Sequence, residues 1–336
     1  MTGRWEQRRL HIVTGKGGTG KTTVAAALAT ALAGQGKTVL IAEVEGRQGI
    51  SQAFDVPPLS TDETQVARGR DGGSITGLSV DAKAALLEYL QMFYKLGRAG
   101  GMLEHFGVVD FATTIAPGVR DVLLIGKVYE AVRRRDERRG HKGEYPYDAV
   151  VLDAPPTGRI GKFLNVNAEF AGLAKMGPLH NQADSIMQLL HSSQTVVHIV
   201  ALLEEMPVQE TVEAVAELRE LGLPVGELMI NRVREPLLSD RARGMVRSAA
   251  AGGRARTRDL IAEDLRAAKV RVSAAMVDGL LDTAVNIDQR LELQDTERED
   301  LAGLALPTTE LPDVPGGVDA GALRELADVL RESGAI

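Results

Sequence analysis

GKGGTGKTT, residues 15–23, decides the fold of this chain. The stretch fits the pattern G-x-x-x-x-G-K-[ST], follows an apolar run at 10–13 and opens into an Ala-rich run at 24–32. A strand, a glycine-rich loop and a helix in this order form the context that a phosphate-binding loop requires. Glycines let the backbone approach a polyphosphate and aim several N–H groups at it, and the positive end of the helix adds to the attraction.

Single residues of the loop have predicted roles. We expect Lys21 to reach the β and γ phosphates of a nucleotide, and the hydroxyl of Thr22 to ligate the magnesium ion that bridges them. Both residues stand where the motif requires them, which favours nucleotide binding over a loop that merely caps a helix. The predicted contacts in the loop are Gly15, Lys16, Gly17, Gly18, Thr19, Gly20, Lys21, Thr22 and Thr23.

Beyond the loop, apolar runs alternate with helical patterns. Four further runs are nearly continuously apolar, as strands buried on both faces of a parallel sheet must be. They cover 37–42, 149–153, 195–203 and 227–231. Between the last two, apolar residues recur at helical spacing over 208–221. The predicted fold class is therefore α/β, a doubly wound, mostly parallel P-loop NTPase sheet with an inserted helical subdomain and its ligand at the carboxyl ends of the strands.

Two segments, 80–139 and 163–191, break the alternation because they carry helical rather than strand periodicity. They flank the run that ends at Asp153, so we expect one helical subdomain inserted into a single P-loop NTPase domain that covers 1–336. Their apolar faces fit ordinary core packing and a groove for a partner equally well, since methionines such as Met187 suit both.

Composition excludes several functional classes. The formal net charge of −7 argues against broad nucleic-acid binding, so no DNA partner is expected. The chain has no cysteine, which removes disulfides, thiolate metal sites and iron–sulfur clusters. No apolar run approaches the roughly 18 residues that can span a bilayer, and the N-terminus lacks a signal-peptide pattern. We expect a cytoplasmic protein that is not an integral membrane protein.

Two stretches resemble a known family. Lys16 directly follows the first glycine, so the loop resembles the deviant Walker A motif shared by MinD, ParA, the nitrogenase iron protein and the arsenical pump ATPases. Residues 153–159, D-A-P-P-T-G-R, resemble the D-T-A-P-T-G-H switch of the arsenical pump-driving ATPase family, which includes the ATPases that deliver tail-anchored membrane proteins. Weaker matches at 78–85, 115–118 and 230–232 extend the likeness over most of the chain.

The resemblance implies an ATP- and magnesium-dependent ATPase that works as a dimer. Lys16 would cross the dimer interface to the nucleotide of the partner subunit, and Asp153 would act on the magnesium ion in the Walker B role. Asn231 would contact adenine, and Pro312 and Asp313 would belong to an adenine loop in the C-terminal segment 306–336, which ends in a helix.

The chain departs from the family at the first switch, where the family reads T-D-P-A-H and residues 44–48 read V-E-G-R-Q. Glu45 thus replaces the aspartate that orients the attacking water. A carboxylate can still position water, but the extra methylene moves it by more than about 1 Å, and a displacement of that order can cost about 100-fold in rate. The predicted catalytic residues are Glu45, Lys16 and Lys21, with slow or partner-dependent hydrolysis.

Three functions remain in competition. The favoured one is a homodimeric or heterodimeric ATPase, paired in the second case with a paralogous ATPase, that couples nucleotide state to an apolar client or a membrane protein. Without cysteine it can have neither the arsenite nor the zinc chemistry of the family. The first alternative is a MinD- or ParA-like positioning ATPase that binds membrane or DNA reversibly. The second, which Glu45 favours, is an ATP-binding regulatory subunit.

Overall fold

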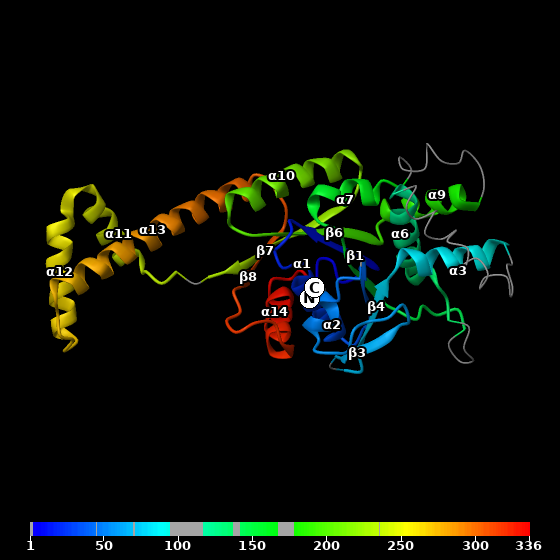
Figure 1. Ribbon diagram of the computed structural model, residues 1–336, viewed down its shortest axis with the longest axis horizontal. Coiled ribbons are helices and arrows are strands. Elements are labelled where there is room, and N and C mark those ends of the chain that lie inside the picture. The colour runs from blue at the N-terminus through cyan, green and yellow to red at the C-terminus, as the bar shows by residue number, and fades with distance from the viewer. Residues whose placement is uncertain are drawn as a thin grey trace. The chain divides into compact units, whose positions relative to one another are not determined.

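The chain folds into two compact units in the computed structural model (Figure 1). The structure describes residues 3–44, 46–69, 71–94, 117–136, 142–166, 178–234 and 236–336. Unit 1 comprises Met1–Leu202, Gln209–Val233 and Leu306–Ile336. Unit 2 comprises Leu203–Val208 and Arg234–Ala305.

The described residues of unit 1 form an eight-stranded sheet in the order β3-β4-β2-β5-β1-β6-β7-β8. All neighbouring strands are parallel except β3 and β4, which are antiparallel. The α/β class and the mostly parallel sheet predicted from the sequence are confirmed. The strands are β1 Leu10–Gly15, β2 Thr38–Val44, β3 Thr64–Arg68, β4 Ser74–Val80, β5 Ala149–Asp153, β6 Thr195–Ala201, β7 Val225–Val233 and β8 Thr308–Pro312.

Helices cover both faces of the sheet, with α1, α2 and α14 on one side and α6, α7 and α9 on the other (Figure 1). This arrangement explains why the central strands are apolar at nearly every position. The helices with residues in unit 1 are α1 Lys21–Ala33, α2 Gly49–Ala53, α3 Ala82–Tyr94, α6 Pro117–Arg133, α7 Thr157–Leu164, α9 Pro178–Leu190, α10 Glu205–Glu220 and α14 Ala320–Glu332.

The core on the first face is centred on α1, which is buried along nearly its whole length. Its alanines allow close approach to the sheet, while Leu323, Leu326 and Leu330 of α14 pack against it in the same apolar cluster. Each fully buried leucine stabilises the fold by about 1.5–3 kcal/mol. The carboxyl end of β1 and the loop that follows it are therefore held on a rigid base.

The predicted helical insertions are described only in part. The first segment, 80–139, contains α3 and α6, which pack against each other, and α6 also contacts α7 and α9. The second begins earlier than expected, because α7 starts at Thr157 rather than near residue 163. Residues 95–116, 137–141 and 167–177 lie outside the described residues, so a client groove built on these segments stays a prediction.

Unit 2 is helical and was not predicted from the sequence. It contains α11 Asp240–Ser248, α12 Arg254–Ala267 and α13 Ala274–Ala302, with a wide helical turn at Ala249–Gly253. The chain kinks within that turn, where Gly252 has φ +105°. Few side chains of these helices are buried, so their apolar periodicity is weak, and periodicity is the signal that reveals a helix in a sequence.

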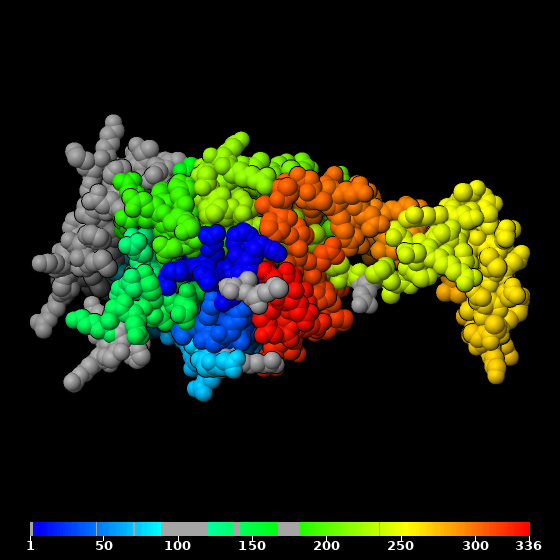
Figure 2. Space-filling view, turned by 180° about the vertical axis from the view of Figure 1, so that it is seen from behind, coloured from blue at the N-terminus to red at the C-terminus, as the bar shows by residue number. Residues whose placement is uncertain are grey.

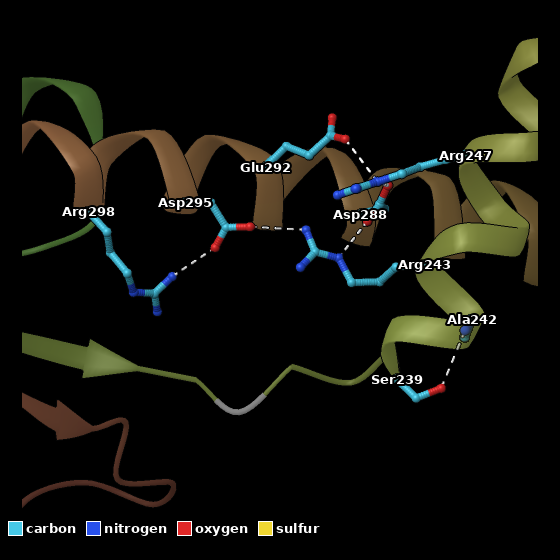
Figure 3. A network of polar contacts seen from close by, with 8 residues as sticks. All are labelled: Ser239, Ala242, Arg243, Arg247, Asp288, Glu292, Asp295 and Arg298. Carbon is cyan, nitrogen blue, oxygen red and sulfur yellow. Dashed lines mark hydrogen bonds and ion pairs between the residues drawn. The ribbon is translucent and has the colours of Figure 1, made fainter.

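A ladder of charged side chains joins α11 to α13 (Figure 3). At its centre the buried carboxylate of Asp288 accepts hydrogen bonds from Arg243 Nε at 2.8 Å and Arg247 Nε at 3.0 Å. Burial alone would raise the pKa of Asp288, but the two arginines outweigh it and hold that pKa below its usual value. Further pairs between the two helices are Arg243–Asp295 and Arg247–Glu292, and Arg298 pairs with Asp295 within α13. Charge pairing thus replaces much of the apolar packing between these helices.

A chain of neutral hydrogen bonds links three strands inside unit 1. His11 of β1 has Nε2 3.1 Å from the carbonyl oxygen of Arg8, so Nε2 carries the proton and Nδ1 accepts. His198 Nε2 lies 3.1 Å from that Nδ1 and therefore donates to it. The backbone N–H of Glu227 in β7 donates to His198 Nδ1 at 3.2 Å. Every ring nitrogen of the two buried imidazoles is satisfied only when both rings are neutral.

The two ends of the described chain meet on one side of unit 1. The backbone N–H groups of Arg4 and Trp5 donate to the carbonyl oxygens of Gly334 and Ala335 at 2.8 and 2.9 Å. In Figure 2 the N-terminal segment and α14 accordingly appear beside each other, in blue and red. Among the described residues, no helix combines the length and apolar character needed to cross a bilayer.

Candidate nucleotide-binding site

The glycine-rich loop follows β1 and uses its glycines in two ways. Gly18 and Gly20 have φ of +90° and +88°, a left-handed backbone that other residues rarely adopt. A Cβ atom on Gly15 would lie 2.2 Å from the carbonyl oxygen of Val200, so only glycine fits there. A Cβ on Gly17 or Gly18 would meet nothing within 4 Å, which leaves this part of the loop open. The loop therefore has the shape of a cradle that a phosphate group can enter.

Lys21 lies beneath this cradle. Its side chain is buried, with the residue only 6% exposed, and its ammonium group donates to the carbonyl oxygen of Lys16 at 3.2 Å. Burial lowers the pKa of Lys21, while the charge of Asp153 opposes this effect. Thr19 donates to the same carbonyl of Lys16 through its hydroxyl, at 2.9 Å. The loop is thus closed by its own side chains, with a positive charge at its centre.

Thr22 and Asp153 meet at the amino end of α1. The Thr22 hydroxyl donates to Asp153 Oδ2 at 2.5 Å, and Asp153 stands at the end of β5, in register with Val13 of β1. Burial raises the pKa of Asp153 to about 6, and the nearby charge of Glu43 adds to this, while Thr22, Lys21 and Arg47 oppose it. A hydroxyl and a buried carboxylate side by side fit a magnesium ion, which prefers hard oxygen ligands and completes its shell with phosphates and water.

Glu43 is a site residue that the sequence analysis missed. Its side chain is 1% exposed at the end of β2, and its two carboxylate oxygens accept the backbone N–H groups of Gln48 at 2.8 Å and Ile50 at 3.2 Å. Gln48 has φ +56° and precedes α2. The sequence did indicate a special role for Glu43, because an acidic residue buried inside an apolar parallel strand requires a nearby hydrogen-bond donor or a positive charge.

Through this anchor, α2 is held against the side of the loop that carries Thr22, the predicted magnesium ligand. A Cβ atom on Gly49, the first residue of α2, would lie 2.8 Å from Cγ2 of Thr22. The start of α2 therefore packs directly on the predicted metal ligand Thr22. Glu45, the predicted catalytic carboxylate between these anchors, lies outside the described residues, and its role stays a prediction.

Asn231 reaches the loop from β7. It is 6% exposed, and its Nδ2 donates to the carbonyl oxygen of Thr19 at 2.8 Å. The structure thus brings Asn231 to the phosphate loop, and the predicted adenine contact stays a prediction. Pro312 and Asp313 lie beside the carboxyl end of β7, the strand that carries Asn231. Pro312 pairs with Val233, and the Asp313 N–H donates to the Val233 carbonyl at 2.9 Å.

The carbonyl of Lys16 helps to close the loop, whereas its side chain pairs with α10. Its ammonium nitrogen lies 2.8 Å from Glu210 Oε1 of α10. Thr23, the last of the predicted loop contacts, follows Thr22 in the first turn of α1. The loop, Asp153 and Asn231 therefore converge at the carboxyl ends of β1, β5 and β7, where open parallel sheets bind their ligands.

Comparison with known proteins agrees with this geometry. The sequence model of the anion-transporting ATPase family matches residues 8–191, which contain the glycine-rich loop and Asp153 but not Asn231. The chain is 48% identical to ATPase BagA of Mycobacterium tuberculosis over 332 residues, 97% of this chain and 93% of that protein.

Two more distant relatives carry informative names. A protein of Aquifex aeolicus named as an arsenical pump-driving ATPase is 26% identical over 67% of this chain and 80% of its own length. ATPase GET3 of Kluyveromyces lactis is 24% identical over 67% of this chain and 72% of its own length. The chain, which contains no cysteine, is an ATPase and belongs to the anion-transporting ATPase family.

Proposed function

We propose that this ATPase is a dimeric, magnesium-dependent switch whose nucleotide state controls binding of an apolar client or a membrane protein. Lys21 and the loop N–H groups would hold the phosphates of ATP, Thr22 and Asp153 would hold Mg²⁺, and the adenine would lie near Asn231. The bound metal would neutralise charge that develops on the phosphates. Arsenite and zinc chemistry through thiolates play no part, because the chain has no cysteine.

The position of Lys16 carries the proposal for a dimer. Lys21 already supplies a buried ammonium group to the loop, whereas the Lys16 side chain is 26% exposed and pairs with Glu210 of α10. A partly exposed lysine of the loop that is held only by this surface ion pair would be able to leave it for a phosphate on a second copy. Because it would bind only the closed, ATP-loaded dimer, it would shift the population toward that state.

Substitution of Lys16 tests this function directly. We expect Lys16→Ala to keep ATP affinity within about threefold, because Lys21 and the loop remain, and to reduce ATP-dependent dimerisation and kcat at least tenfold, as a charge removed from a phosphate site does. Sedimentation velocity with ATP, together with steady-state ATPase assays, measures both. A Lys16→Ala chain that dimerises and turns over ATP like the unaltered protein would show that the proposal is wrong.

A regulatory subunit is the second candidate, and Glu45 is the observation that favours it. Under this function the chain would bind ATP and turn it over only when paired with a paralogous ATPase. A MinD-like membrane role finds less support, because Leu323, Leu326 and Leu330 of α14 are buried against α1 instead of forming an exposed apolar face.

A further inference from the structure

One carboxylate of α10 contacts two parts of the nucleotide site. Glu210 Oε1 lies 2.8 Å from the ammonium nitrogen of Lys16, and Glu210 Oε2 accepts a hydrogen bond from the hydroxyl of Thr157 at 3.2 Å. Lys16 belongs to the phosphate loop, whereas Thr157 is the first residue of α7. Both contacts lie within unit 1 and join segments that are far apart in the sequence.

Thr157 lies in the segment that leads from Asp153 into α7. Its side chain is buried, and the preceding Pro155 is fixed to β1, because the Thr14 hydroxyl donates to the Pro155 carbonyl oxygen at 2.8 Å. This segment starts at the predicted metal ligand Asp153, only four residues before Thr157. A shift of Asp153 on binding of the phosphates or the metal would therefore also displace Thr157. Thr157 then lies one hydrogen bond from Glu210 and two contacts from Lys16.

The Lys16–Glu210 pair has a strength suited to a reversible contact. The side chains of Lys16 and Glu210 are 26% and 33% exposed. Ion pairs of this exposure shift an equilibrium by roughly 1.4- to 5-fold. A polyphosphate, with several negative charges and charge-assisted hydrogen bonds, competes for the same ammonium group far more strongly. The pair therefore biases the position of Lys16 without locking it.

We propose that Glu210 is a positioning residue that holds Lys16 on its own subunit until ATP binding moves the segment around Thr157. In the ADP-bound or nucleotide-free chain, Glu210 would pair with Lys16 and oppose dimer closure. In the ATP-bound chain, displacement of Thr157 would turn the Glu210 carboxylate and release Lys16 toward the second subunit. The inference rests on the proposed function. It means that the nucleotide bound in one subunit controls whether Lys16 of that same subunit can reach the partner.

The test compares protein concentrations at which half of the chain is dimeric, with ADP and with ATP. Glu210→Gln should lower this concentration about 2- to 25-fold in ADP, because each of the two subunits loses one ion pair of about 1.4- to 5-fold, and change it less than 1.5-fold in ATP, where the pair is already broken. Sedimentation velocity measures both values. Glu210→Asp keeps the charge and should fall between Glu210→Gln and the unaltered chain.

Glu213→Gln is the matched control, since Glu213 lies on the same helix, is exposed and contacts Gln209 instead of the loop. It should leave both concentrations unchanged. Equal shifts in ADP and ATP, or an ADP value equal to that of the Glu213→Gln chain, would overturn the inference. If Lys16→Ala does not weaken ATP-dependent dimerisation, the proposed function fails first, so the two failures are distinguishable. Thermal unfolding of each variant checks that the fold is retained.

Discussion

Glu43 shows how one buried carboxylate can shape the site without touching substrate. Its two oxygens accept the N–H groups of Gln48 and Ile50, and these bonds fix the start of α2 beside Thr22. A glutamine at position 43 would have only one acceptor oxygen in its side chain. Its NH₂ group, which is a donor, would face one of the two backbone N–H groups, which is also a donor. Backbone displacements of about 1 Å at a catalytic loop can cost about 100-fold in rate.

We therefore expect Glu43→Gln to lower kcat about 10- to 100-fold with a smaller change in KM, since the phosphate cradle itself is formed by other residues. Steady-state ATPase kinetics over a range of ATP concentrations separate the two constants. Gly244→Ala serves as a control, because a Cβ there would meet nothing within 4 Å and α11 lies in unit 2. A kcat within twofold of the unaltered chain would contradict the positioning role.

Glu45 makes a separate prediction at the same strand end. The Glu45→Asp chain should turn over ATP about 10- to 100-fold faster than the unaltered chain, because an aspartate would place its carboxylate at the distance from the attacking water that the resemblance to the family implies. Single-turnover hydrolysis measures the chemical step without interference from product release. Equal rates for the two chains would mean that the extra methylene does not limit hydrolysis.

At the residue scale, the site residues that could be predicted from the sequence are those at positions that accept only one residue type. Gly15 has no room for a Cβ, and Lys21 and Thr22 occupy places that the motif defines. The contact of Asn231 with the Thr19 carbonyl could not be predicted, because it depends on how close β7 brings an amide to the loop. Such distances follow from the packing of whole elements and leave no local pattern.

The His11–His198 chain makes the stability of the central strands depend on pH. Burial lowers the pKa of His11 to about 3, helped by the charges of Lys37 and Arg8 and opposed by the hydrogen bond to the Arg8 carbonyl. Burial and the neighbouring His11 lower the pKa of His198 well below its usual value. In the unfolded chain both imidazoles have pKa values near 6.5. Below that pH the unfolded chain binds more protons, so acid favours unfolding.

The free energy of unfolding should fall as the pH drops from about 6.5 toward 3, by up to about 1.4 kcal/mol per pH unit for each histidine. Urea unfolding at several pH values measures the slope. Nitrogen-detected NMR at pH 5.5 should show both rings neutral, with protons on Nε2. A ring that titrates near pH 6.5 in the folded protein would contradict the buried hydrogen-bond chain.

The ladder of unit 2 allows a matched comparison of two carboxylates on α13. Asp288 is buried and accepts bonds from two arginines, whereas Asp282 is exposed and pairs with Arg254. Asp288→Asn should destabilise the helical unit by about 1–3 kcal/mol, because it weakens two charge-assisted bonds in a buried place. Asp282→Asn should have a much smaller effect. Hydrogen exchange of α11 reports both, and equal protection in the two variants would refute the difference.

At the element scale, the sequence predicted strands with near-continuous apolar runs and missed those without them. β1, β2, β5, β6 and β7 were expected, since burial on both faces dictates their composition. β3, β4 and β8 were not expected: the edge strands β3 and β8 have exposed positions, and glycine and hydroxyl residues interrupt the apolar run of β4. The helices of unit 2 were missed because charge pairs, which any surface helix can carry, hold them together.

For the whole molecule, the dimer proposal predicts that specific activity depends on concentration. ATP turnover per chain should rise with protein concentration and level off once the dimer predominates, because under this proposal Lys16 would complete the site only in trans. A dilution series with saturating ATP and Mg²⁺ measures this dependence. Turnover that is constant over 100-fold dilution and rises only when a paralogous ATPase is added would favour the regulatory-subunit function.

The parallel pairing of β7 and β8 has a consequence for engineering this chain. Val233, at the end of β7, lies opposite Pro312 at the end of β8, so a connection must run back along the strand before β8 can begin. Unit 2 is part of that connection. A shortened chain without residues 234–305 would need a linker of at least about six extended residues to cover the roughly 20 Å from Val233 to Leu306. Simple excision would instead pull β8 out of register and detach the strand that leads to Asp313 and α14.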